Sequence, residues 1–203
     1  MNQTKTVSSI TLPANNNVSV LAMTLIPAVQ VSLASAYNRN AFDTDGTPFA
    51  SGGIDGFGFA YSGSLLGGTQ TVNGTVFNFG PPNALNSVAN ATVTLPARNF
   101  SALNLLATGV GGLQPSQTVT VNYTDGTSTP LVQGFSDWFV PGGFSGESPG
   151  VTMAYRNIYN GTKDVRPFLL YSYSFALNVA KTVKSVKLPA NSNVVVLAVT
   201  AIP

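Results

Sequence analysis

Hydrophobic and polar residues alternate along much of this chain with the period of two that is typical of β-strands. Threonine or asparagine alternates with valine or tyrosine over residues 118–123. Residues 169–177 place a large apolar side chain at every second position, namely Leu169, Tyr171, Tyr173, Phe175 and Leu177. Residues 194–202 are rich in β-branched side chains and apolar on both faces. This last pattern favours a strand that is covered on both faces.

Short polar turns separate these segments. Asn73-Gly74, Asp125-Gly126 and Asn160-Gly161 each match the dipeptides that favour a tight β-hairpin, because both turn residues adopt positive φ there. The chain also contains 20 glycines and 13 prolines, and helical periodicity is nearly invisible. We therefore predict an all-β fold, a two-sheet antiparallel β-sandwich of the jelly-roll type.

The two ends of the chain carry the same segment. Residues 5–27 match residues 181–203 without a gap, and 16 of the 23 aligned positions are identical. Because the offset of 176 residues is the size of a domain, we interpret residues 28–203 as one complete module. Residues 1–27 are then the terminal β-hairpin of a preceding repeat in a tandem array. We expect this N-terminal copy to pack as an extra hairpin at an edge or in an intermolecular contact, while the C-terminal copy occupies its own module.

A weaker echo lies inside the module. Residues 93–108 resemble residues 10–24, and in both a Leu-Pro-Ala sequence precedes a second apolar run. Two explanations stay open at this point. The echo supports a two-sheet body, or both segments are ordinary strand–turn–strand hairpins.

The amino-acid composition excludes several classes of function. Charged residues make up only 8% of the 203 residues and the net charge is +2, so the basic stripe of a nucleic-acid-binding surface is missing. Neither cysteine nor histidine occurs, which excludes disulfides, Ser-His-Asp triads and thiolate or imidazole metal sites. No pair among the seven carboxylates is marked by its surroundings as the acid and base of a glycosidase. The longest apolar run is far shorter than a membrane helix. We expect no catalysis, no nucleic acid and no membrane insertion.

A set of short motifs resembles a known kind of module. The motifs are FDTDG, GGIDGFGFAYS, VFNFGPPNA, VNYTDGT, FSDWF, AYRN, YSYSFALN and the terminal KTVKSVKLPANSNVVVLAV. Together they resemble a β-sandwich accessory module of secreted bacterial glycoside hydrolases and serine-carboxyl peptidases. The resemblance covers residues 29–202 and implies a jelly-roll or galactose-binding-like fold, a non-catalytic role and a secreted or cell-surface location. It supplies no binding residues.

The only tryptophan marks a candidate ligand site. Asp137 and Trp138 precede a loop rich in glycine and proline, and Tyr155 and Arg156 form a second polar-aromatic pair. An exposed indole can stack on a sugar ring while a neighbouring carboxylate accepts from its hydroxyls. In the alternative, Trp138 caps the core and Asp137 binds loop amides. Arg156 either bridges sugar hydroxyls or pairs with Asp137.

Acidic residues in a glycine-rich loop suggest a metal. Asp43 and Asp45 stand in the sequence FDTDGT, which resembles half of a calcium-binding loop, although the later acidic ligand of an EF-hand is absent. We predict a structural calcium at these two residues, with Asx turns as the alternative. Phe57, Phe59 and Tyr61 alternate with small residues, which favours core positions over a binding platform.

These observations favour a secreted, non-catalytic module that binds carbohydrate. Its expected partners are a polysaccharide or glycan surface and other copies of the same module. The alternative is a structural or adhesive cell-surface or filament repeat without a small ligand.

Overall fold

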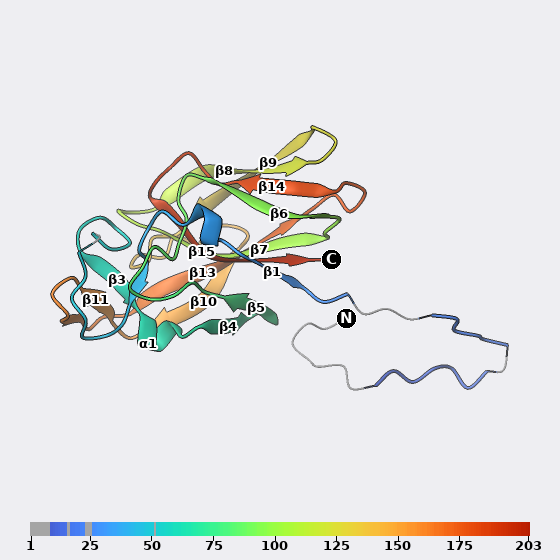
Figure 1. Cartoon of the computed structure of the whole chain (residues 1–203), viewed down its shortest axis with the longest axis horizontal. Coiled ribbons are helices and arrows are strands. Elements are labelled where there is room, and N and C mark those ends of the chain that lie inside the picture. Colours follow the sequence, from blue (N-terminus) through green and yellow to red (C-terminus); the bar gives the residue numbers. More distant parts are fainter. Residues whose placement is uncertain (1–8, 16, 23–25, 51) are drawn as a thin grey trace.

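The computed structural model describes residues 9–15, 17–22, 26–50 and 52–203. Within these residues, two antiparallel sheets face each other (Figure 1). The larger sheet has the order β1-β15-β7-β13-β10, with β1 at Val29–Val31, β15 at Val194–Ile202, β7 at Ala102–Gly109, β13 at Phe168–Ala176 and β10 at Glu147–Met153. The smaller sheet has the order β6-β14-β8-β9, with β6 at Thr92–Arg98, β14 at Val183–Lys187, β8 at Gln114–Tyr123 and β9 at Ser128–Phe135.

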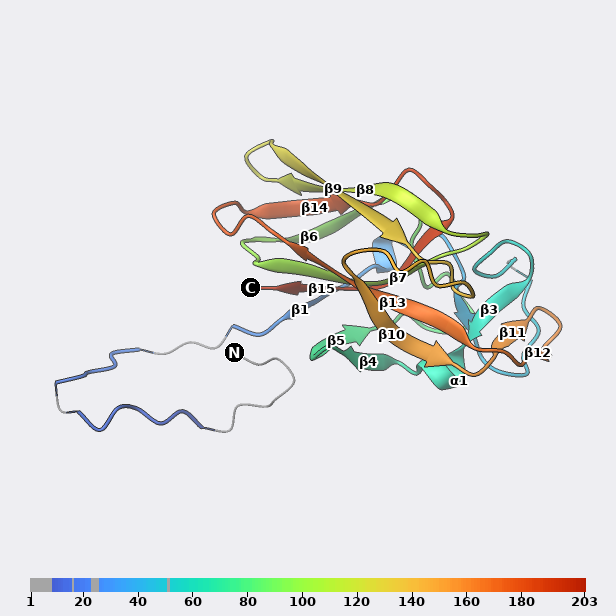
Figure 2. The ribbon, with the colours of Figure 1, turned by 180° about the vertical axis from the view of Figure 1, so that it is seen from behind.

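A third, smaller layer covers part of the outer face of the larger sheet (Figure 2). It contains the sheet β12-β11-β3-β2, with β12 at Lys163–Asp164, β11 at Arg156–Ile158, β3 at Phe59–Ser62 and β2 at Phe42–Asp43. The pairing of β2 with β3 is parallel. The hairpin of β4 (Thr69–Val72) and β5 (Thr75–Asn78) also belongs to this layer, as does the one-turn helix α1 (Gly63–Leu66). A short 3-10 helix, η1 (Ala34–Ala36), packs near β6.

Two hydrophobic cores result from this layering. The first lies between the two main sheets and includes Leu105, Tyr173 and Val186. The second lies between the larger sheet and the third layer and includes Phe77 and Leu197. Every residue of β15 is buried because this strand faces both cores. The expectation of a terminal strand covered on both faces is therefore confirmed.

The local predictions hold in several places. The all-β, mostly antiparallel class is confirmed. Tyr171, Tyr173 and Phe175 share the inward face of β13, although this strand ends at Ala176. Asn73 and Gly74 join β4 to β5 with φ values of 49° and 76°, as a tight hairpin turn requires.

The C-terminal copy of the repeat is not a hairpin, which corrects the prediction. β14 pairs with β6 and β8 in the smaller sheet, whereas β15 pairs with β1 and β7 in the larger one. The chain between them crosses from one sheet to the other, a connection that we call an arch. The internal echo has the same form, since β6 and β7 also lie in different sheets. Val186 lies opposite Val93. Both residues correspond to Ile10, Val93 through the internal echo and Val186 through the terminal repeat. The echo thus reflects a two-fold relation between two adjacent arches and not two hairpins.

The N-terminal copy behaves differently from its C-terminal counterpart. Its described residues, 9–15, 17–22 and 26–27, form no strand, and the first two stretches extend away from the sandwich in both ribbon views (Figures 1 and 2). Leu21 is 96% exposed, whereas its counterpart Leu197 is fully buried. The expected hairpin at an edge of the module is therefore not found among the described residues, and residues 5–8, 16 and 23–25 of the copy lie outside them.

Candidate functional site

Trp138 lies in the second core, not on the surface. Its side chain is 3% exposed, and its ring contacts the rings of Tyr61 and Phe168 at centroid distances of 5.3 and 5.2 Å. Its backbone N–H donates to Gly109 and its carbonyl accepts from Leu169, so the main chain is fixed as well. Trp138 therefore completes the core, as the alternative interpretation stated. In this position the indole has no free face for a sugar.

Asp137 organises loops beside the core. Its Oδ2 accepts from the backbone N–H of Gly112 at 2.9 Å, and its Oδ1 accepts from the N–H groups of Phe139 and Val140 at 2.9 and 3.2 Å. Charged acceptors of this kind form strong hydrogen bonds with backbone donors. Both carboxylate oxygens are therefore engaged with loop amides, as the alternative interpretation stated.

Arg156 lies among aromatic rings and pairs with Asp164, not with Asp137. Its guanidinium carbon is 3.6 Å from the ring centre of Phe59, 4.8 Å from that of Trp138 and 4.5 Å from that of Phe168. Its Nε is 3.0 Å from Asp164. Burial lowers the pKa of Arg156, while the negative charge of Asp164 opposes the shift. These contacts bring Trp138 and Arg156 together, two of the predicted ligand residues, but they do so inside the protein.

Tyr155 and Asp45, predicted for two different sites, belong to one network. The Tyr155 hydroxyl donates to Asp45 Oδ2 at 2.5 Å, and Ser62 Oγ and Asn157 Nδ2 donate to Asp45 Oδ1 at 2.7 and 3.1 Å. Lys163 Nζ lies 3.3 Å from the same carboxylate. Burial alone raises the pKa of Asp45, but these donors outweigh it and lower the pKa to about 2.

The carboxylates predicted to bind calcium already have partners in the protein. Both oxygens of the buried Asp43 accept from Asn40 Nδ2, at 2.9 and 2.8 Å, and burial raises the pKa of Asp43. Calcium prefers six to eight oxygen ligands, whereas donors surround both Asp43 and Asp45. In the part of the chain that the structure describes, no three acidic side chains converge as metal ligands. The residues present therefore do not fit the predicted calcium ion.

The network around Asp45 predicts a difference between two matched substitutions. Asp45→Asn should lower the free energy of unfolding at neutral pH by about 2 kcal/mol, because a pKa depressed from 3.8 to about 2 stabilises the folded state. This contribution is present above the unfolded-state pKa and is lost as pH falls through the folded-state value. Asp43→Asn removes a charge whose raised pKa opposes folding, so it should cost less stability than Asp45→Asn.

Urea unfolding of both variants at pH 7 and pH 3 measures these effects. The loss in Asp45→Asn should shrink at the lower pH. Equal losses at both pH values would contradict the assignment.

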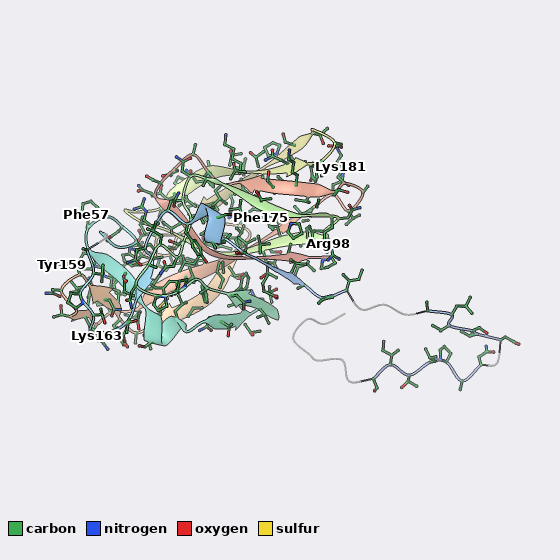
Figure 3. The ribbon with its side chains drawn as sticks, viewed as in Figure 1. Phe57, Arg98, Tyr159, Lys163, Phe175 and Lys181 are labelled. Atoms are coloured by element: carbon green, nitrogen blue, oxygen red, sulfur yellow. The ribbon has the colours of Figure 1, made fainter. Side chains whose placement is uncertain are left out.

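Exposed aromatic side chains gather at one end of the molecule. Phe57 and Tyr159 are 81% and 57% exposed, and Figure 3 shows them with Lys163 at the end away from the N-terminal segment. Tyr159 packs over Gly58, where an added Cβ would lie 2.9 Å from its ring. The prediction of core positions is thus right for Tyr61 and wrong for Phe57, which precedes β3 and points outward.

A polar pocket lies on the outer face of the larger sheet. Its volume is about 310 Å³, which suits a small ligand or one residue of a polymer. Its lining comes from the β4–β5 hairpin and from β7, β10, β13 and the end of β15, and consists of Asn73, Thr75, Ser101, Ala102, Asn104, Gly146, Ser148, Ser172, Ser174 and Ile202. None of these side chains carries a charge.

Hydrogen bonds hold the walls of the pocket together. Asn73 Nδ2 donates to Ser148 Oγ at 2.8 Å, which ties the β4–β5 turn to β10. Asn104 Nδ2 donates to Thr75 Oγ1 at 2.9 Å. Asn104 Oδ1 is buried without a protein donor, and a buried acceptor in that state costs free energy.

The pocket offers hydroxyl and amide groups that both donate and accept. This chemistry matches a neutral ligand with several hydroxyls, and it does not match an anion because no cation lines the walls. Sequence reasoning missed the pocket because its residues come from distant segments. The available signal was Ser172 and Ser174, which alternate with the aromatic inward face of β13.

The fold is a β-sandwich with an uncharged polar pocket on its larger sheet. The family model of the AziU2-like beta-sandwich domain matches residues 27–203, so the chain belongs to this family. No curated protein matches the chain. Among the described residues, neither helix is long and apolar enough to cross a membrane.

Proposed function

We propose that this chain is a non-catalytic carbohydrate-binding module, an accessory domain of secreted bacterial enzymes such as glycoside hydrolases or serine-carboxyl peptidases. The observation that carries the proposal is the uncharged pocket of serine, threonine and asparagine side chains on the larger sheet. Sugar hydroxyls pair with such groups as donors and acceptors at once.

The chemistry of the carboxylates supports a binding role over catalysis. A glycosidase needs a proton donor and a second carboxylate across a cleft. Asp137 and Asp45 are occupied by loop amides and by a hydrogen-bond network, and Glu147 accepts from Ser136 Oγ at 2.6 Å and from the backbone N–H of Phe144 at 3.1 Å. None of these three lines the pocket.

The terminal duplication supports an extracellular array. Two copies of one segment at the spacing of a domain are expected where modules follow one another in a chain. We place such an array outside the cell, on a polysaccharide or cell surface, with further copies of the module as its neighbours. The low charge and the abundance of serine, threonine and asparagine fit this location.

Two matched tryptophan substitutions test the pocket as the ligand site. Ser174 and Ala176 are both exposed and both point outward from β13, but only Ser174 lines the pocket. Ser174→Trp should fill the cavity and weaken binding at least tenfold, whereas Ala176→Trp should change it less than twofold. A glycan array followed by calorimetric titration with neutral oligosaccharides measures the affinities, with a sulfated polysaccharide as the charged control.

Three outcomes weigh against the proposal. Equal affinities of the two variants would remove the pocket from the binding site. Selective binding of the sulfated polymer would contradict the neutral chemistry. No binding to any glycan would favour the rival function, a structural or adhesive repeat.

A further inference from the structure

The arch of β14 and β15 fills an interior slot in both main sheets. β14 lies between β6 and β8, and β15 lies between β1 and β7. The N-terminal segment carries a second version of this arch sequence. The family match begins at residue 27, so most of this segment lies outside the domain. Two segments of this chain therefore have a sequence that could form the arch, but the sandwich has one place for it.

The apolar pattern of the slot is retained in the N-terminal segment. Val186, Leu188, Val196 and Leu197 of the arch are each no more than 1% exposed. Their counterparts are also large and apolar, and are about half exposed or more in the present structure, namely Ile10, Leu12, Val20 and Leu21. Large apolar side chains gain free energy when they leave water. The N-terminal segment thus exposes to solvent the kind of side chains that the C-terminal arch buries.

The register of β1 places the slot within reach of the same chain. Val29 lies opposite Ala201 and Val31 opposite Val199, so β1 begins beside the end of β15. Ile26, the counterpart of Ile202, comes only three residues before Val29. If the N-terminal segment took the place of β15, residues 26–28 would connect it to β1. Three residues are enough for a β-hairpin loop.

We propose that the slot accepts either segment and that the N-terminal segment replaces β14–β15 within the same chain when the C-terminal arch is weakened. Domain swapping uses the same exchange of equivalent elements at low cost. A single sequence difference explains why the C-terminal arch, and not the N-terminal segment, occupies the slot in the present structure. Val195 is fully buried in the second core, whereas its counterpart is Ser19.

A double-mutant cycle tests the exchange. Leu21→Asp changes an exposed side chain and should leave the melting temperature unchanged. Leu197→Asp puts a charge into the second core, but the chain should still melt cooperatively because the N-terminal segment fills the slot. Leu21→Asp combined with Leu197→Asp should lose the cooperative melt. Such non-additivity is expected when two sites share one function.

Proteolysis reports which arch is left out. Lys184 and Lys187 lie in β14 and should resist trypsin in the wild-type chain. In Leu197→Asp, trypsin should cleave after Lys184 and Lys187, release the displaced arch and leave a folded remainder of monomeric mass. Thr11→Asp combined with Leu197→Asp is the matched control, because the counterpart of Thr11 is the exposed Lys187. This control should behave like Leu197→Asp alone.

Two results would overturn the proposal. Leu197→Asp alone could unfold as completely as the double variant, or it could fold only as a dimer. As a second variant that does not threaten folding, Ser19→Val should increase trypsin cleavage after Lys187 in the otherwise wild-type chain. Unchanged cleavage in Ser19→Val would also count against exchange.

Discussion

Replacement of Trp138 by alanine should lower the free energy of unfolding by about 3–5 kcal/mol, the usual cost of removing a large aromatic side chain from a core. The indole is 3% exposed and packs against Tyr61 and Phe168. It also supports the guanidinium of Arg156 at 4.8 Å. Urea unfolding followed by far-ultraviolet circular dichroism measures the loss.

The same substitution separates the core role from the predicted role in sugar stacking. Trp138→Phe keeps an aromatic ring in the cavity and should recover about half of the lost stability. At a temperature where Trp138→Ala remains folded, its affinity for glycans should match that of the wild type. Weakened binding with unchanged stability would show that the tryptophan contacts the ligand.

Removal of the Arg156 side chain should cost about 3 kcal/mol, because it removes one partner of a largely buried ion pair and the cation–π contacts with three rings. Arg156→Lys should recover only part of the loss, since an ammonium group lacks the planar face that stacks on Phe59. Thermal and urea unfolding of both variants provide the comparison.

Arg166 provides a matched control for Arg156. It pairs with the same Asp164, but its side chain is 51% exposed. Exposed ion pairs contribute little, so Arg166→Ala should cost less than about 1 kcal/mol. Arg166 also lies over an aromatic ring, 4.6 Å from the centre of Phe139, so the two arginines differ mainly in burial. Equal losses of stability in the two alanine variants would show that burial of Arg156 adds nothing to its contribution.

The sequence predicts most of what is local in this fold. The alternation in β13, the positive-φ turn at Asn73 and Gly74, and the strand at residues 194–202 follow from side-chain period and turn chemistry. The sheet to which a strand belongs is not local information. The Leu-Pro-Ala turn suits a hairpin or an arch. Only the pairing of β14 with β6 and β8, and of β15 with β1 and β7, shows that it forms an arch.

The absence of non-local information from the sequence also explains why the predicted ligand and calcium residues have other roles in the structure. The sequence indicated that Trp138 is either a platform or a core residue, and the packing of Phe168 against it makes it core. Asp43 and Asp45 have the spacing of calcium ligands, but Asn40 and Tyr155 donate to them instead. The neutral pocket draws on strands far apart in the chain, so no contiguous motif marks it.

The pocket on the larger sheet can be tested directly by nuclear magnetic resonance. A neutral oligosaccharide selected on the glycan array is titrated into the isotope-labelled chain, and backbone amide shifts are followed. Saturable shifts should concentrate at Asn104, Ser148 and Ser172, and they should disappear in Ser174→Trp but persist in Ala176→Trp. Shifts centred on Phe57 and Tyr159, or no saturable shift with any glycan, would contradict the assignment of this pocket as a carbohydrate site.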